Sequence, residues 1–194
     1  MAPKNRFALT DIVDAALSVV RMSGLENLTA RAVANEMKSS TMPIYSCGRT
    51  MAEIEADVVK RCWDILAQHQ REPKTRDTYV DIGLGYVLFA KHEKHLFGCI
   101  HNPRHLELNR KYAAENFQLN LERLKDYQPL ASVGDDLKLK IMIQGWIFCH
   151  GLADLLSRTP VSLETDEDIA AFVVESNRIV HSGIKHVGDE EQAG

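Results

Sequence analysis

The stretch LTARAVANEMKSSTMPIY at residues 28–45 decides the fold that we expect. Thr29 can cap a short helix because its hydroxyl can accept a backbone N–H of the first turn, and Val33 lies on the buried face of that helix. The hydroxyls of Ser39-Ser40-Thr41 supply a turn and a new helix start, and Pro43 fits only in the first turn of this second helix. Two helices joined by a short turn, the second rich in hydroxyls, are the layout of a helix-turn-helix.

Helical periodicity continues on both sides of this stretch, and strand alternation is almost absent. Upstream, Thr10 can cap a helix that Gly24 ends as a left-handed residue. Downstream, Gly83 and Gly85 weaken one expected helix, and a short element near 92–100 is undecided. The apolar stripes predict helices at 50–70, 77–91, 103–127, 135–157 and 166–186. The sequence therefore predicts an all-α protein of about nine helices that ends in a disordered polar tail at 188–194.

The composition is that of an ordinary globular protein, with 194 residues, 45% hydrophobic and 26% charged. No uninterrupted apolar run approaches 18 residues, so we expect no membrane span, and the charged start has no apolar run behind it that would make a secretion signal. The four cysteines are widely spread and form no CxxC pair, which suits a reducing compartment. A cytoplasmic location is therefore expected.

The charge is unevenly distributed along the chain. The net charge is −4, yet residues 1–50 carry six basic and four acidic side chains, so the remainder carries −6. A mildly basic head on an acidic body is typical of a DNA-binding module attached to a domain that does not bind DNA.

The segment 135–157 is apolar nearly all round, so it must be covered on nearly all sides. One face can cover the core of the chain, and the other then needs a partner, which a two-fold homodimer supplies. Gly145 and Gly151 would let the backbones of two copies approach closely. A central helix buried within a single chain is the alternative. The two faces carry Leu137, Ile141, Gly145, Phe148, Leu152 and Leu155 on one side and Leu139, Met142, Trp146, Ala153 and Leu156 on the other.

Three runs in order, IVDAALSVVRMSGL (12–25), LTARAVA (28–34) and STMPIY (40–45), resemble the N-terminal domain of the TetR (tetracycline-repressor) family. The motif around Trp146 and His150-Gly151 also resembles some members. The resemblance implies a DNA-binding domain at 1–50 and an effector-binding and dimerisation domain at 51–187. It further implies a dimer through the helices at 135–157 and 166–186.

The resemblance also implies roles for individual residues. Thr29 would hold a phosphate, Arg31 would reach a phosphate or a base edge, and Tyr45 would contact a phosphate. The residues that would face the major groove are Ser40, Thr41, Met42, Pro43 and Ser46. Lys4 and Arg6 lie on an arm that could touch phosphates or the minor groove.

Two departures from the family pattern concern the residues after Tyr45. Cys47-Gly48 stands where the family usually has an aromatic that packs the turn. Met51 stands where a lysine usually begins the fourth helix and grips a phosphate, a contact that Arg49 could replace.

The expected function is a ligand-responsive transcriptional repressor that binds a palindromic, double-stranded operator as a homodimer and is released by a small hydrophobic effector. The helix at 50–70 is the only long element expected to join the DNA head to the body, so it is the natural lever. The expected ligand-binding residues are Tyr86, Phe89, His105, Phe117, Trp146 and His150. A helical dimeric scaffold that has lost DNA binding is the alternative, and a helical enzyme is a third class.

The remaining reactive side chains suggest neither metal nor catalysis. Four histidines and Cys99 crowd residues 92–105, but Gly98 and Pro103 interrupt the segment, so we expect no metal and no cofactor. Cys47 could be a redox trigger, although a small thiol that fills space is the simpler interpretation. No nucleophile triad, phosphate loop or carboxylate pair stands out, so we expect no enzymatic activity.

Overall fold

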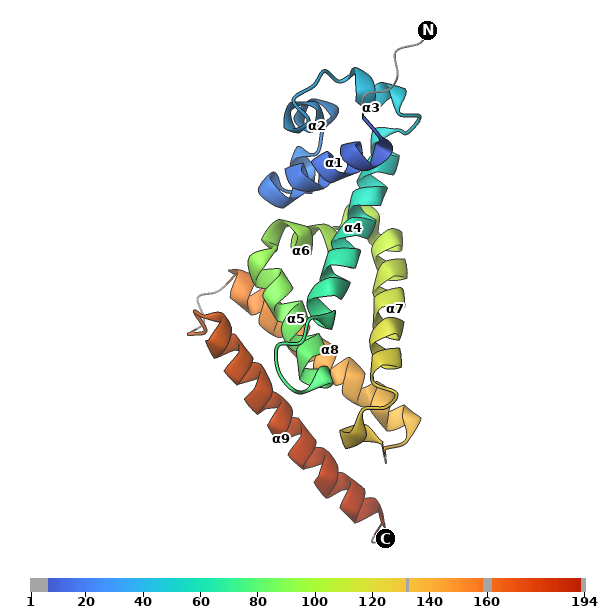
Figure 1. Cartoon of the computed structure of the whole chain (residues 1–194). Coiled ribbons are helices and arrows are strands. Elements are labelled where there is room, and N and C mark those ends of the chain that lie inside the picture. Colours follow the sequence, from blue (N-terminus) through green and yellow to red (C-terminus); the bar gives the residue numbers. More distant parts are fainter. Residues whose placement is uncertain (1–6, 132, 159–161, 193–194) are drawn as a thin grey trace. The chain divides into compact units, whose positions relative to one another are not determined.

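The computed structural model describes residues 7–131, 133–158 and 162–192. Over this part of the chain there are nine α-helices, three 3-10 turns and no strand, which confirms the expected all-α fold (Figure 1). The helices are α1 (Leu9–Ser23), α2 (Ala30–Glu36), α3 (Met42–Ser46), α4 (Met51–Arg71), α5 (Thr78–His92), α6 (Lys94–Ile100), α7 (Leu106–Arg123), α8 (Asp135–Arg158) and α9 (Asp166–Gln192).

The chain forms two compact units, each discontinuous in sequence. Unit 1 comprises residues 1–68 and 92–120, and unit 2 comprises residues 69–91 and 121–194. The boundary expected at residue 50 therefore falls inside unit 1, because α6 and most of α7 pack with the N-terminal helices.

The N-terminal head of unit 1 folds around a small apolar core. Ile12, Val20, Val33 and Ile44 are buried there to 1% exposure or less, one or more from each of α1, α2 and α3. The expected Thr10 cap is wrong. Helix α1 begins at Leu9, and the Asp11 carboxylate accepts the Ala8 N–H at 2.8 Å, because an acidic side chain is well placed at a helix N-terminus.

Helix α1 ends at Gly24 as predicted, with a positive φ of 88°. Its ψ of 164° is extended rather than left-handed helical, so the chain leaves the helix directly into the 3-10 turn η1 (Leu25–Asn27). A side chain at this φ would be strained, which explains the glycine.

The head is also held by α6, which packs against α1 and η1. Arg21 on α1 pairs with Glu93 at 2.9 Å, and Asn102 donates to Glu26 at 3.2 Å. The short helix α6, of 7 residues, therefore contacts the head as well, while α4 is the long element that follows the head in sequence. These contacts join residues more than 70 positions apart in the sequence, so the local apolar periodicity could not predict them.

Within unit 1, polar contacts join α4 to α7 and to the 3-10 turn η2 (Pro103–His105) that precedes α7. The Trp63 indole N–H donates to Asn109 at 3.0 Å, and His105 Nε2 lies 2.6 Å from Glu55. The buried residues of α7 are Asn109 and Asn120, whereas Leu106 is 48% exposed, so the apolar stripe expected along this helix is only partly covered.

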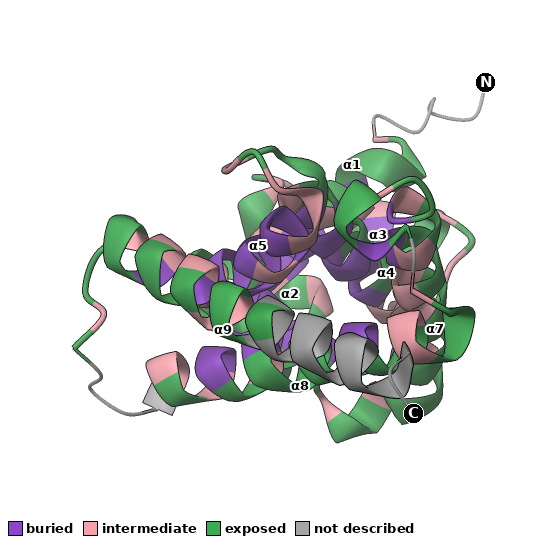
Figure 2. Cartoon of the chain, turned by 90° about the horizontal axis from the view of Figure 1, so that it is seen from below, coloured by how far each residue is buried: buried purple, intermediate pink, exposed green. Residues whose placement is uncertain are grey.

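Unit 2 is built around α5, whose residues are mostly buried (Figure 2). A Cβ on Gly85 would collide with the backbone of His69, and one on Gly83 would lie 2.8 Å from the Cys149 sulfur. The two glycines therefore let α5 pack closely against the end of α4 and against α8. They are compatible with the helix because close packing offsets their low propensity.

One of the two glycines of α8, Gly145, packs against a residue of the same chain rather than lying open to a second copy. A Cβ on Gly145 would collide with the Tyr79 hydroxyl, which donates to the Ile141 carbonyl at 3.1 Å, whereas one on Gly151 would meet open space. Gly145 thus serves contact within unit 2, and Leu152, at 6% exposure, is also buried there. The Cβ position of Gly145 is therefore directed at Tyr79, and the Leu152 side chain is covered within the chain.

By length and composition, Asp135–Ser157 is apolar enough to cross a membrane, although no uninterrupted apolar run indicated it. A single helix of mean hydropathy 1.2, with 28% of the window buried, is weak evidence for a span, since the core helix of a globular protein passes the same test of length and composition.

The expected tail at 188–194 is wrong for its first five residues. Helix α9 continues to Gln192, because Gly188 alone does not stop a helix when the following residues favour one and no proline intervenes. The last two residues of the expected tail lie outside the described part of the chain.

Candidate nucleic-acid interface

Helix α3 separates its side chains sharply between core and solvent. Ile44 is 1% exposed, whereas Met42 and Tyr45 are each 70% exposed. Ser40 and Ser46 are exposed as well, and Thr41 and Pro43 are half-buried. The exposed face therefore carries the residues that were expected to face a groove, on a helix fixed to the head by one buried isoleucine.

Helix α2 begins as its sequence predicts. The Thr29 hydroxyl accepts the Ala32 N–H at 3.1 Å, and Arg31 in the first turn is exposed. Lys38, at a φ of 50°, reverses the chain after α2, and the Ser39 N–H donates to the Ala34 carbonyl at 2.9 Å. These bonds fix the turn between the two helices.

A hollow of about 460 Å³ lies beside α2 in the head. Polar side chains of α1, η1 and α2 dominate its lining, and Arg31 is the only base among them. The lining residues are Ser23, Glu26, Asn27, Thr29, Arg31, Ala32 and Asn35. The lining therefore holds one guanidinium and one carboxylate beside hydroxyl and amide groups, so its formal charge is balanced.

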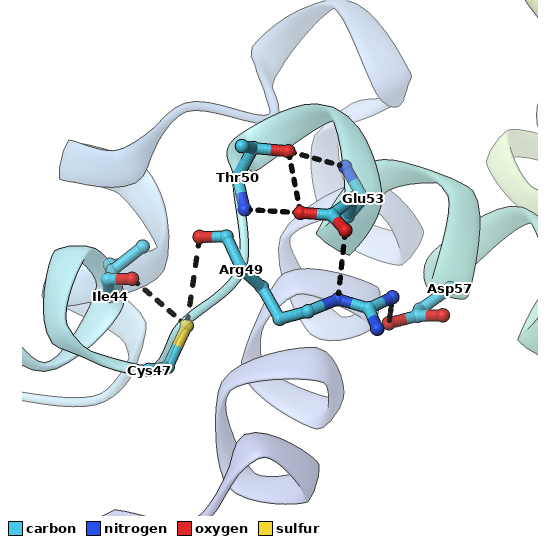
Figure 3. A network of polar contacts seen from close by, with 6 residues as sticks. All are labelled: Ile44, Cys47, Arg49, Thr50, Glu53 and Asp57. Carbon is cyan, nitrogen blue, oxygen red and sulfur yellow. Dashed lines mark hydrogen bonds and ion pairs between the residues drawn. The ribbon is translucent and has the colours of Figure 1, made fainter.

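At the junction between α3 and α4, the Cys47 thiol lies where the family pattern has an aromatic side chain (Figure 3). The half-buried Cys47 thiol donates to the Ile44 carbonyl at 3.0 Å, so it closes α3 rather than facing solvent. Gly48 follows with a φ of 77°, which only glycine adopts without strain.

Arg49, the expected substitute for the missing lysine, is already paired (Figure 3). Its Nη2 lies 2.9 Å from Asp57, and its Nε lies 3.8 Å from Glu53. Glu53 in turn accepts the Thr50 N–H at 2.7 Å and the Thr50 hydroxyl at 2.9 Å. The backbone hydrogen bond from Thr50, followed by the hydroxyl bond, lowers the pKa of Glu53.

This network was missed by sequence reasoning. The spacing of Arg49, Glu53 and Asp57 by four residues was available as an indication, because such side chains meet on one helix face. Lys4 and Arg6, the two bases of the expected arm, lie outside the described residues.

Three of the six expected ligand-binding residues come together in unit 2. The Tyr86 hydroxyl and His150 Nδ1 are 2.8 Å apart, and the Trp146 and His150 rings lie 6.3 Å apart. Burial raises the pKa of Tyr86, while the nearby Trp146 hydrogen bond opposes the shift. Trp146 is 50% exposed, so this group has an accessible aromatic face.

The other three expected ligand residues are not part of that group. Phe89 is fully buried and meets the His69 ring edge-on at 5.6 Å. His105 and Phe117 belong to unit 1, where His105 is paired with Glu55.

A second exposed surface runs along α8 and α9 in unit 2, whose residues are largely exposed (Figure 2). Phe148 of α8 and Phe172 of α9 stack at 6.0 Å. The exposed large apolar residues of the two helices are Leu139, Ile143, Trp146, Ile147, Phe148, Leu155, Phe172 and Ile179. We call these eight residues together the apolar face, although on α8 they lie on two sides of the helix, Leu139 and Trp146 on one and Phe148 and Leu155 on the other.

The histidine-rich segment shows no metal-binding geometry within the described residues, where no three potential ligands come together. His101 packs edge-on against Phe97 at 4.6 Å. The two buried thiols of unit 1, Cys62 and Cys99, contact each other, and this hydrogen bond, followed by burial, raises the pKa of Cys62.

No protein-family model matches the chain, and no curated protein matches it in sequence. The resemblance to TetR regulators therefore rests on the residues quoted from the sequence.

Proposed function

We propose that the chain is a homodimeric transcriptional repressor of the TetR type, located in the cytoplasm, which binds double-stranded operator DNA through α2 and α3. The observation that carries this proposal is the division of α3 between core and solvent. Its single buried residue fixes the helix, and its outward face offers hydroxyls, a phenol and a thioether. Hydroxyls donate to phosphates and base edges, and small side chains allow a helix to approach the major groove.

The apolar face supports the dimer. Eight exposed large apolar side chains on two helices are more than a soluble monomer usually leaves uncovered, so a second copy is the simplest cover for those other than Trp146, which is assigned to the effector site below. Two copies can enter successive major grooves only if their α3 helices lie about 34–36 Å apart.

The effector site is proposed at Tyr86, Trp146 and His150. An aromatic face beside a phenol and an imidazole is suited to a small, mostly hydrophobic ligand with one polar group. Such a ligand can release DNA only if it binds the conformation with low DNA affinity more tightly than the conformation with high DNA affinity. A hundredfold fall in DNA affinity requires a difference of about 2.7 kcal/mol between the two ligand-binding free energies.

One alternative is favoured by a specific observation. Met51 lacks the charge for one expected phosphate contact, and the pairing of Arg49 with two carboxylates removes its expected substitute, which is what a dimeric scaffold that has lost DNA binding would show.

Gel retardation of a DNA fragment from upstream of the protein's own gene separates the two proposals. A repressor retards this fragment in preference to a shuffled fragment of equal length and composition, and an effector reverses the shift. A scaffold retards neither fragment at any protein concentration in the micromolar range.

A further inference from the structure

The junction between α3 and α4 places one base between two acids. Arg49 Nη2 lies 2.9 Å from Asp57, Nε lies 3.8 Å from Glu53, and the Arg49 side chain is only 34% exposed. Its Nε atom is buried and makes no hydrogen bond, so the guanidinium is committed to ion pairs rather than directed at solvent.

One of the two acids, Glu53, is fixed in place by the start of the helix. Glu53 accepts two bonds from Thr50 and donates its own N–H to the Thr50 hydroxyl at 3.2 Å, which is a capping box at the start of α4. Asp57 lies one turn later on the same face. The three side chains together carry a net charge of −1 at the end of the head that bears α3.

A phosphate backbone is repelled by this arrangement. Phosphate binding depends on bases that are available to replace counterions, and a base already neutralised by two carboxylates contributes little to that term. Arg31, by contrast, is exposed in the first turn of α2.

We propose that Glu53 and Asp57 restrain Arg49 and thereby hold the affinity of the head for DNA below the value its bases would otherwise give. This inference rests on the proposed function. Neutralising Asp57 releases the guanidinium toward phosphate and strengthens binding to every duplex, whatever its sequence. The two acids thus lower the affinity for DNA, and they do so by holding Arg49 away from phosphate.

The test is Asp57→Asn, with Asp64→Asn as the matched control. Asp64 lies on the same helix and pairs with Lys60 at 2.8 Å, so its replacement removes the same charge without touching Arg49. Fluorescence anisotropy measures the affinity for the upstream fragment and for a shuffled duplex over a series of salt concentrations. Thermal unfolding checks that each variant folds.

Asp57→Asn is expected to bind both duplexes about three- to tenfold more tightly and to steepen the salt slope by about 0.9, which is one added phosphate contact. Asp64→Asn is expected to stay within about twofold of the wild type because a distant charge is screened. Arg49→Gln alone is expected to bind less tightly than the wild type, because it leaves the Glu53 and Asp57 carboxylates without their base, and Arg49→Gln combined with Asp57→Asn is expected to lose the gain.

Three results overturn the inference. If Asp57→Asn binds less tightly or equally, the acids hold Arg49 in place for DNA or have no effect on it. If Asp64→Asn gains as much, or if the double variant keeps the gain, Arg49 is not the base released. These results all leave DNA binding by the wild type intact, whereas failure of every folded variant to bind either duplex refutes the proposed function as well.

Discussion

Two regions of this chain expose large apolar side chains, and their surroundings differ. On α3, Met42 and Tyr45 stand singly among hydroxyls. On α8 and α9, eight large apolar residues form the apolar face, with Phe148 stacked on Phe172. The surface of α3 can contact a hydrated polyanion with little loss of apolar burial. The apolar face, by contrast, is unfavourable while it is exposed to water, so covering it lowers the free energy. An exposed apolar residue therefore indicates a protein partner when its exposed neighbours are also apolar, and not when it stands alone among polar groups.

We expect DNA binding to depend strongly on salt and self-association to depend on it weakly, and this difference is the largest effect that we predict. A dimer that contacts about six to ten phosphates loses about 10³- to 10⁵-fold in DNA affinity between about 50 and 200 mM salt. Self-association through the apolar face is expected to change little over this range, since apolar burial is not screened. Anisotropy titrations and sedimentation velocity at the same salt concentrations measure the two. Parallel weakening of both would show that the dimer interface is electrostatic and would break the comparison.

A charge placed on the apolar face is expected to have the next largest effect. Leu155→Glu, at a residue 50% exposed in the single chain, should weaken dimerisation by about a hundredfold or more, because a carboxylate buried without a partner costs several kcal/mol. Sizing with light scattering measures the mass. Leu119→Glu on α7 is the control, since Leu119 is 54% exposed but lies outside the apolar face. A Leu155→Glu protein that stays dimeric would place the interface elsewhere.

Loss of the contacts on α2 and α3 is expected to cost less. Arg31→Ala combined with Tyr45→Phe should weaken operator binding by about 1–3 kcal/mol for each contact that reads a base, and should leave thermal stability unchanged because both side chains are exposed. Arg110→Ala on α7, an exposed base paired with Glu107, controls for the loss of positive charge. A large fall in the unfolding temperature would show that the two residues are structural.

The smallest expected effect concerns the inner side of α8. Burial raises the pKa of Tyr79 to about 12, from about 10 in an unfolded chain. The neutral phenol therefore stabilises the fold fully below pH 10, and this contribution is lost as the pH rises from 10 through 12.

Denaturant unfolding at pH 8 and pH 11 measures this loss. The wild type is expected to lose about 1 kcal/mol more than Tyr79→Phe between the two pH values. Equal losses in the two proteins would show that Tyr79 is not shielded from water by Gly145 and its neighbours.

The sequence predicted the features that depend on local chemistry. The Thr29 cap, the turn after α2 and the extents of α4, α5 and α8 follow from capping residues and apolar spacing, and the structure confirms them. The exposed face of α3 was likewise expected, because Ile44 is the one β-branched aliphatic residue of this five-residue helix.

The features that sequence reasoning missed depend on which face of a helix meets which neighbour. Gly145 was expected between two copies, yet it accommodates Tyr79 from α5 of the same unit. Arg49 was expected to reach phosphate, yet it is paired with Glu53 and Asp57. A spacing of four residues shows which side chains can meet, but whether they do depends on the positions of partners that periodicity does not specify.

The most direct test of the central claim is to count the chains on DNA. Sedimentation equilibrium of the full-length protein with the upstream fragment, at about 150 mM salt, measures the mass of the complex and its affinity. The account predicts two chains on each binding site and an affinity for this fragment at least about 10³-fold higher than for a shuffled duplex. One chain on each site, or equal affinity for the two duplexes, would contradict it.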